Sequence, residues 1–475
     1  MKEYDLIVIG TGSAMNLVDP FLRQNHHAKV AVIDKDEPGG ICLTRGCIPS
    51  KLILYPAELV REIEKAKELN IDVEIKNVDF KGIMNRMRDT INHDIDQIRQ
   101  GLSTTNEIDY YPEIAEFIEP YTLKVGDEII KSDLIFLCTG SKPTIPLIKN
   151  LEEISYHTSR SVLKLDELPE SIVIVGGGYI AAEYGHFFAA MGSEVTIVGR
   201  NPQFLPQEEP EISAIALKEL SKHMKIITNS EVVEASLTPN GKKKIIAKNR
   251  LNNEVFEVIA SDILISAGRS SLNDILKPEK SDIEIDKRGW IKTNEFLETS
   301  KPGIWAFGDA NGKYLFKHAA NYESRVVYYN ALLRREVPVD YHAIPSAVFT
   351  YPEIASVGLR EKEAIERFGK DGIVIGLQRY QDTAKGEAIA AKDYFVKVII
   401  ERENNRILGA HIVGPQASVL IQEIINLMYT HDQSTDPINV GMHIHPALTE
   451  VVERAFYSLM PVDHYHENLK HFGLE

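Results

Sequence analysis

The chain of 475 residues is too long for a single hydrophobic core, so we expect it to divide into two to four domains. Apolar residues make up 44% and charged residues 26%, as in ordinary globular proteins, and no apolar run is long enough to cross a bilayer. A formal net charge of −16 argues against a nucleic-acid partner, and three cysteines without a cleavable leader predict a cytoplasmic protein.

The N-terminal segment has the pattern of a dinucleotide-binding unit. A short β-rich run leads directly into Gly10-Thr11-Gly12, and the next predicted strand, 29–33, is followed by Asp34. The glycines would let the backbone approach a pyrophosphate at a helix N-terminus, and Asp34 would accept hydrogen bonds from ribose hydroxyls. Met15 occupies a position that is usually Gly or Ala, and Pro20 lies early in the expected helix. We therefore expect that helix to be short or displaced.

Two cysteines follow in the segment GGICLTRGCIPSK, which spans residues 39–51. Cys42 and Cys47 are five residues apart, and because the only other cysteine is Cys138, the pair indicates a redox centre and not a disulfide scaffold. The frame GGxCxxxGCIPSK resembles the redox-active disulfide of the flavin-dependent pyridine nucleotide-disulfide oxidoreductases. The resemblance implies an enzyme, an FAD-dependent NAD(P)H:disulfide oxidoreductase. In it Cys47 is the flavin-proximal sulfur and Cys42 attacks the substrate.

Cys42 is then expected near a helix N-terminus, where the helix dipole lowers the pKa of a thiol. By the same resemblance, Lys51 matches a lysine placed near flavin N5, and Glu183 matches the glutamate that pairs with it. Tyr179 matches an aromatic residue that covers the flavin until nicotinamide displaces it, although simple packing is the alternative. Arg45, between the cysteines, could meet an anionic substrate or face solvent, and both possibilities stay open.

Two further segments resemble FAD-binding landmarks of that family. Leu137-Cys138-Thr139-Gly140 resembles the strand end that closes the first FAD lobe. Residues 304–309, which end in Gly308 and Asp309, resemble the second FAD motif, whose aspartate contacts the ribityl chain.

The dinucleotide-binding pattern returns in the middle of the chain, with a strand at 171–175, the fingerprint residues Gly176, Gly178 and Ala181, and a strand at 194–198. The second strand leads into Gly199 and Arg200, where NADH-selective relatives carry an acid. An arginine without that acid suits a 2′-phosphate, so NADPH is favoured and NADH is possible. The second arginine of the glutathione reductase pattern is absent, and Pro206 stands near its place. We also expect Gly268, at the end of this segment, to bind nucleotide.

The acid-base partner is expected near the C-terminus. Residues 443–450, HIHPALTE, resemble the family's HxHPxxxE signature. Pro446 is suited to the first position of a helix, so His445 would precede that helix and Glu450 would lie in its first turns and orient the imidazole. In the family this pair reaches the disulfide of the other subunit, which implies a homodimer with shared active sites.

The resemblance implies an α/β fold with two Rossmann-like dinucleotide-binding domains, for FAD and NAD(P)H, and a C-terminal α+β dimerisation domain. The expected boundaries are 1–150 and 269–345 for the FAD-binding part, 151–268 for the NAD(P)H-binding domain, and 346–475 for the dimerisation domain. No metal is expected in the site.

The substrate is less constrained than the reaction. Residues 156–159, 315–325 and 414–422 resemble mycothione reductases. The first hypothesis is therefore an NADPH-preferring reductase of a small-molecule disulfide, formed from a low-molecular-weight thiol that the sequence does not identify. The alternative is a dihydrolipoyl dehydrogenase, which oxidises protein-bound dihydrolipoamide with NAD in a 2-oxoacid dehydrogenase complex. An acid at position 199 would have favoured the alternative.

Overall fold

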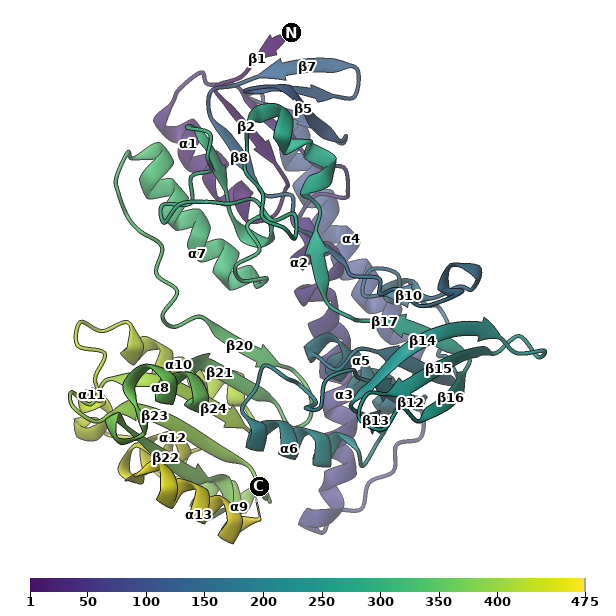
Figure 1. Cartoon of the computed structure of the whole chain (residues 1–475), viewed down its shortest axis with the longest axis vertical. Helices are drawn as coiled ribbons and strands as arrows, with labels where there is room; N and C mark the ends of the chain where they lie inside the picture. The colour runs from purple at the N-terminus through teal and green to yellow at the C-terminus, as the bar shows by residue number, and fades with distance from the viewer. Residues whose placement is uncertain (474–475) are drawn as a thin grey trace.

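The first dinucleotide-binding unit forms a parallel sheet near the N-terminus (Figure 1). The structure, a computed structural model, describes residues 1–473. The sheet has the order β19-β8-β2-β3-β4, with β2 (Leu6–Ile9), β3 (Val30–Ile33), β4 (Ile108–Tyr111), β8 (Ile135–Leu137) and β19 (Ile304–Ala306). Four of these strands are fully buried, as expected when both faces are covered. Strand β19 lies far along the chain, so the chain returns to this sheet after building a second one.

The segment after the first glycine turn is short, as the sequence predicts. A 3₁₀ helix, η1 (Ser13–Leu17), precedes α1 (Val18–Gln24). Pro20 lies in the first turn of α1, where its missing N–H costs no helical hydrogen bond. Helix α7 (Lys317–Val327) packs against η1, and Ser13 donates to Asn321 on α7 at 2.9 Å.

Smaller strands, one short helix and two long helices complete this part of the molecule. The strands are β1 (Lys2–Glu3), β5 (Ala115–Glu119), β6 (Thr122–Val125) and β7 (Glu128–Lys131) in one sheet, and β9 (Ser141–Pro143) with β18 (Arg269–Ser271) in another. The helices are α2 (Gly40–Arg45), α3 (Cys47–Lys65) and α4 (Phe80–Thr104). Helix α3 extends from the first sheet toward the second one, where it packs against α5 (Tyr179–Met191) (Figure 1).

The second parallel sheet has the order β10-β17-β11-β12-β13. Its strands are β10 (His157–Thr158), β11 (Ser171–Val175), β12 (Glu194–Val198), β13 (Lys225–Ile227) and β17 (Asp262–Ile265). A meander of β14 (Ser230–Leu237), β15 (Lys243–Asn249) and β16 (Val255–Ala260) connects β13 to β17. Strands β11 and β12 have the bounds that the sequence predicts.

The two glycine turns meet the same constraint. Gly10 has φ +105°, and a Cβ there would lie 2.1 Å from the carbonyl oxygen of Cys138. Gly176 has φ +141°, and a Cβ there would lie 2.3 Å from the carbonyl oxygen of Ser266. In both units the first glycine is needed because the turn crosses directly over the end of a neighbouring strand.

The C-terminal part is an antiparallel sheet of order β20-β21-β24-β23-β22-β25. Its strands are β20 (Pro345–Val348), β21 (Ile354–Gly358), β22 (Ile373–Arg379), β23 (Phe395–Glu401), β24 (Ile407–Val413) and β25 (Leu459–Met460). Its helices are α8 (Glu361–Phe368), α9 (Ala384–Ala388), α10 (Ala417–Met428), α11 (Asp436–Val440), α12 (Thr449–Tyr457) and α13 (Val462–Phe472). Among residues 1–473, no helix combines the length and apolar character needed to span a bilayer. The predicted α/β architecture with a C-terminal α+β part is confirmed.

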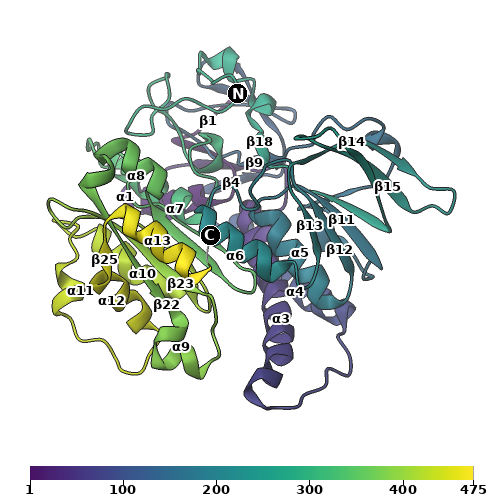
Figure 2. The same ribbon diagram turned by 60° about the horizontal axis from the view of Figure 1, so that its bottom comes forward.

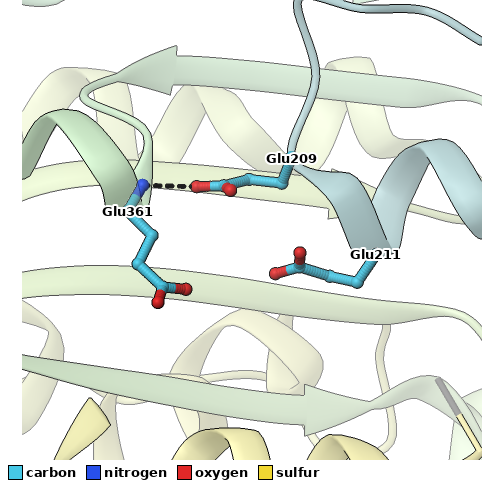
Figure 3. Close-up of side chains that lie close together, drawn as sticks. All are labelled: Glu209, Glu211 and Glu361. Atoms are coloured by element: carbon cyan, nitrogen blue, oxygen red, sulfur yellow. Dashed lines mark hydrogen bonds between the residues drawn. The ribbon is translucent and has the colours of Figure 1, made fainter. Parts of the chain in front are cut away.

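Helix α6 (Pro210–Leu220) lies between the second sheet and the C-terminal sheet (Figure 2). Three buried carboxylates meet at this junction, those of Glu209, Glu211 and Glu361 (Figure 3). The ammonium of Lys397, which is 0% exposed, lies 2.6 Å from Glu211, 2.8 Å from Glu361 and 3.5 Å from Glu209. Burial alone would lower the pKa of Lys397, but the surrounding carboxylates raise it overall. Three carboxylates can hold a metal ion, but here the cation is the lysine, and the cluster joins the two sheets.

We predict that Lys397→Met destabilises the junction strongly, because it leaves three buried carboxylates without their cation. Removing one partner of a buried ion pair costs about 3–5 kcal/mol. The thermal unfolding midpoint should fall by several degrees, measured by calorimetry beside Lys362→Met, whose side chain is 86% exposed. Equal midpoints for the two variants would show that Lys397 does not hold the junction.

Candidate active site

A cavity of about 650 Å³ lies where the three sheets meet. Its walls include residues from the first glycine turn, the cysteine segment, the two FAD-like landmarks and the start of α5. The predicted site residues in these walls are Gly10, Gly12, Asp34, Cys42, Cys47, Lys51, Gly140, Tyr179, Glu183, Gly308 and Asp309. The fold therefore gathers residues separated by up to 299 positions, from Gly10 to Asp309, around one space.

The glycine turn and the cysteine segment touch at one end of this cavity. Gly40 has φ +68°, and a Cβ there would lie only 2.6 Å from the Cα of Gly12, so position 40 needs a glycine. Thr11 donates to Asp34 through its amide at 2.9 Å and its hydroxyl at 2.6 Å, and its hydroxyl accepts from the amide of Gly39 at 2.9 Å. A bare backbone beside a fixed carboxylate suits the pyrophosphate and ribose of FAD.

The two cysteines lie in different helices. Cys42 is the third residue of the six-residue α2, whereas Cys47 is the first residue of the nineteen-residue α3, and both are free thiols. The pKa of Cys47 is lowered to about 7, chiefly by the hydrogen bond from Cys42 and, against burial, by the charge of Lys51. The pKa of Cys42 is raised, first because its thiol donates to Cys47 and then because it is buried.

The prediction of a lowered pKa for Cys42 is therefore wrong for the reduced pair. The longer helix and the nearby ammonium both favour the anion on Cys47. Cys42 keeps the proton that the two sulfurs share, so it needs a base before it can attack a disulfide.

Lys51 and Glu183 form the ion pair that the sequence predicts. The Lys51 ammonium lies 2.9 Å from each carboxylate oxygen of Glu183, which is 7% exposed. Phe349 supports both partners, because its amide donates to Glu183 at 3.1 Å and its ring lies 4.3 Å from the Lys51 ammonium. No sequence motif indicated Phe349, since its role follows from the position of β20 beside α5.

Tyr179 lies in an aromatic group at the edge of the cavity. Its ring centroid is 6.4 Å from that of Phe316, which stacks on His318 at 5.2 Å with an interplanar angle of 11°. Burial is the main cause that raises the pKa of Tyr179 to about 12. The hydroxyl is thus neutral, and the ring presents an apolar face to the cavity.

Arg45 lines the cavity, but its side chain is only 17% exposed and its guanidinium is paired. Its guanidinium donates to Asp36 at 2.7 Å and to Thr44 at 2.9 Å. Burial would raise the pKa of Asp36, but Arg45, with Lys35 and Arg160, lowers it overall. Arg45 therefore ties the cysteine segment to the turn that carries the predicted ribose acid.

Asp309 meets a residue that the sequence did not single out. Ser141 donates to Asp309, and Arg269 donates to Ser141 and lies 3.8 Å from the Asp309 carboxylate. Burial raises the pKa of Asp309 more than these two partners lower it. Arg269 belongs to none of the sequence motifs. The only local indication of its role was its position directly after Gly268, close to the end of β17.

His445 and Glu450 form a pair outside the cavity of their own chain. Nδ1 of His445 lies 2.8 Å from Glu450, which also accepts from Arg454 at 3.0 Å. The hydrogen bond with His445 is the main cause that lowers the pKa of Glu450. The His445 side chain is 67% exposed, and it is held to its own chain through Nδ1. Pro446 does not start the helix as predicted: the His445–Pro446 bond is cis, and α12 begins at Thr449.

The remaining predicted residues lie at the edge of the second sheet. Gly176, Gly178 and Ala181 form the turn and first residues of α5, and Arg200 follows β12. Gly268, with φ +114°, follows β17. None of these five lines the cavity that holds the cysteines.

Comparison with known families agrees with this arrangement. The profile described as "Pyridine nucleotide-disulphide oxidoreductase" matches residues 4–324, and the profile described as its dimerisation domain matches residues 344–456.

Individual relatives cover nearly the whole chain. A mycothione reductase from Mycobacterium tuberculosis is 34% identical over 97% of this chain and 100% of its own length. A dihydrolipoyl dehydrogenase from Synechocystis is 33% identical over 96% of this chain and 98% of its own. Among solved structures, the Cu(II) complex of the HOCl-induced flavoprotein disulfide reductase RclA from Escherichia coli has a TM-score of 0.85. It is 26% identical, with 96% of this chain and 99% of that chain covered.

We predict that the Cys47 thiolate titrates near neutral pH. In Cys42→Ser, whose hydroxyl can still donate to Cys47, ultraviolet thiolate absorbance should rise around pH 7 instead of around 9, the ordinary value. As the pH falls through 7 the thiolate should be lost. Adding Lys51→Met should raise this pKa, whereas the surface change Lys76→Met should not. A midpoint near 9 both with and without Lys51 would contradict this account.

Proposed function

The chain belongs to the pyridine nucleotide-disulphide oxidoreductase family, whose enzymes use FAD and NAD(P)H, and on that premise we propose that it reduces the disulfide of a low-molecular-weight thiol, with NADPH preferred. The observation that carries the reaction is the Cys42–Cys47 pair, which lies in one cavity with Lys51 and Glu183. Similarity to mycothione reductase supports a small-thiol substrate, and Gly199-Arg200 supports NADPH.

Residues 1–150 and 269–345 bind FAD, residues 151–268 bind NAD(P)H, and residues 346–475 form the interface of a homodimer. Gly10, Gly12, Asp34, Gly140, Gly308 and Asp309 bind FAD, and Gly176, Gly178, Tyr179, Ala181, Arg200 and Gly268 bind NAD(P)H.

FAD bound in this cavity would supply the two-electron transfer from NAD(P)H that reduces the Cys42–Cys47 disulfide. Lys51, held by Glu183 and by the ring of Phe349, provides the positive charge beside these sulfurs. The reduced pair then holds one proton and one negative charge, and the anion rests on Cys47. This distribution leaves the attacking sulfur protonated.

The partner subunit's His445 would remove the proton from Cys42. Because Nδ1 of His445 is paired with Glu450, its Nε2 is free to accept a proton. The Cys42 thiolate attacks one sulfur of the substrate, forms a mixed disulfide and releases a first thiolate, which takes the proton back from His445. Cys47 then attacks the Cys42 sulfur, which restores the disulfide and releases the second thiolate. One NADPH and one proton are consumed for each substrate disulfide reduced to two thiols.

The test is steady-state turnover of the purified flavoprotein with a panel of disulfides and with dihydrolipoamide. We expect fast oxidation of NADPH with a small-thiol disulfide, and the panel identifies the thiol. Fast oxidation of dihydrolipoamide with NAD⁺, together with no turnover of small disulfides, would instead establish a dihydrolipoyl dehydrogenase.

A heterodimer tests whether the active sites are shared. If Cys42→Ser and His445→Ala chains are co-expressed and the mixed dimer is purified, one of its two sites contains both intact residues. It should have about half of the wild-type activity, while both parent homodimers should be nearly inactive. A mixed dimer as inactive as its parents would mean that each chain uses its own His445.

A further inference from the structure

The end of β12 lacks the acid that binds an unphosphorylated ribose, and the backbone leaves little room for one. A Cβ on Gly199 would lie 3.2 Å from the Cα of Gly177, tighter than ordinary van der Waals contact. The next residue, Arg200, is exposed. Because dinucleotides bind at the carboxyl ends of parallel strands, Arg200 lies where the ribose of the adenosine half is expected.

A second arginine reaches this edge from the turn between β15 and β16. A guanidinium nitrogen of Arg250 donates to the carbonyl oxygen of Arg200 at 2.9 Å. The side chain therefore lies against the end of β12, although the two residues are 50 positions apart. The meander that carries Arg250 lies beside the second sheet (Figure 1).

Backbone hydrogen bonds fix the position of this turn. The amide of Arg250 donates to the carbonyl of Asn229 at 2.7 Å, and the amide of Asn229 donates to the carbonyl of Asn201 at 2.9 Å. Ser230 donates in the same way to Gly199 at 2.9 Å. The turn is thus anchored to the segments that follow β12 and β13, so the place of Arg250 is set by the fold and not by its own side chain.

The charges at this edge are unbalanced. Segments 199–203, 228–230 and 249–253 contain two arginines and no carboxylate, in a chain whose net charge is −16. Within residues 1–473, neither Arg200 nor Arg250 forms an ion pair with a carboxylate, whereas other arginines and lysines do. The Arg250 guanidinium is held at this strand end, beside the exposed Arg200. Two arginines in these segments without a carboxylate favour an anion with several oxygens, and phosphate fits guanidinium donors well.

We propose that Arg250 binds the 2′-phosphate of NADPH together with Arg200, so that the β15–β16 turn supplies the second cation that the loop after β12 lacks. This inference rests on the NADPH preference proposed above. Glutathione reductases carry a second arginine near the position that Pro206 occupies in this chain. Arg250 would replace that missing arginine and so let the site select the phosphorylated coenzyme.

The experiment compares Arg250→Gln, Arg250→Lys and Arg200→Gln holoenzymes with the wild type. Glutamine keeps a donor for the Arg200 carbonyl but removes the charge, and lysine keeps the charge. Lys248→Gln is the matched control, since it removes an exposed cation two residues away on the same hairpin. The readouts are KM and kcat with NADPH and with NADH, and inhibition by 2′,5′-ADP compared with 5′-AMP.

We expect Arg250→Gln to raise KM for NADPH and Ki for 2′,5′-ADP by about ten-fold or more, a change of ~1.4 kcal/mol. KM for NADH, Ki for 5′-AMP and kcat should stay near the wild-type values. Arg250→Lys should recover part of the loss, and Lys248→Gln should behave like the wild type.

Three results would overturn the inference, and they are distinguishable. If the wild type prefers NADPH and only Arg200→Gln reduces that preference, Arg250 has no part in it and the proposed function stands. If Arg250→Gln weakens both coenzymes equally, Arg250 is only a structural tether. If the wild type does not discriminate 2′,5′-ADP from 5′-AMP, the NADPH preference itself is wrong, and the inference fails with it.

Discussion

The packing of α3 against α5 is the contact on which the rest of the site depends. Helix α3 carries Cys47 and Lys51 from the first sheet, and α5 carries Tyr179 and Glu183 from the second. The ion pair between Lys51 and Glu183 crosses this contact, and Phe349 closes it from the C-terminal sheet. A thiolate, an ammonium and the expected nicotinamide gate are thus held together by elements of three sheets, and residues of α3, the second sheet and the C-terminal sheet share one hydrophobic core.

The same packing decides where the negative charge lies in the reduced pair. Because Cys47 begins the long helix and is near Lys51, it holds the anion, and Cys42 holds the proton. With the resting thiolate on Cys47, the attacking sulfur of Cys42 stays protonated until a base arrives. In the proposed mechanism that base belongs to the partner subunit, which makes assembly of the dimer a condition for turnover and not merely for stability.

Local patterns predicted the parts of the fold that depend on neighbouring residues. The two glycine turns were predictable because each directly follows a β-rich run in the sequence. Strands β11 and β12 begin and end at the residues that their β-branched runs indicate. Pro20 correctly indicated a short first helix.

What the sequence could not show were contacts between distant segments. In the sequence, Lys397 is a single lysine in an otherwise apolar strand. Only the fold shows that the start of α6 and the start of α8 bring three carboxylates to it. Arg250 and Phe349 lie in no motif, because their partners come from other layers. The proton distribution between the cysteines was also missed, since it depends on the hydrogen bond between the two thiols and on the charge of Lys51, one turn further along α3.

The central claim is that Cys42 attacks the substrate and Cys47 resolves the product, and trapping the mixed disulfide tests it most directly. Reduced Cys47→Ser protein would be mixed with the best disulfide substrate, and its tryptic peptides analysed by mass spectrometry beside Cys42→Ser. The account predicts one substrate thiol attached to Cys42 in the first protein and no stable adduct in the second. An adduct on Cys47 in Cys42→Ser, with none on Cys42 in Cys47→Ser, would reverse the two roles and contradict the account.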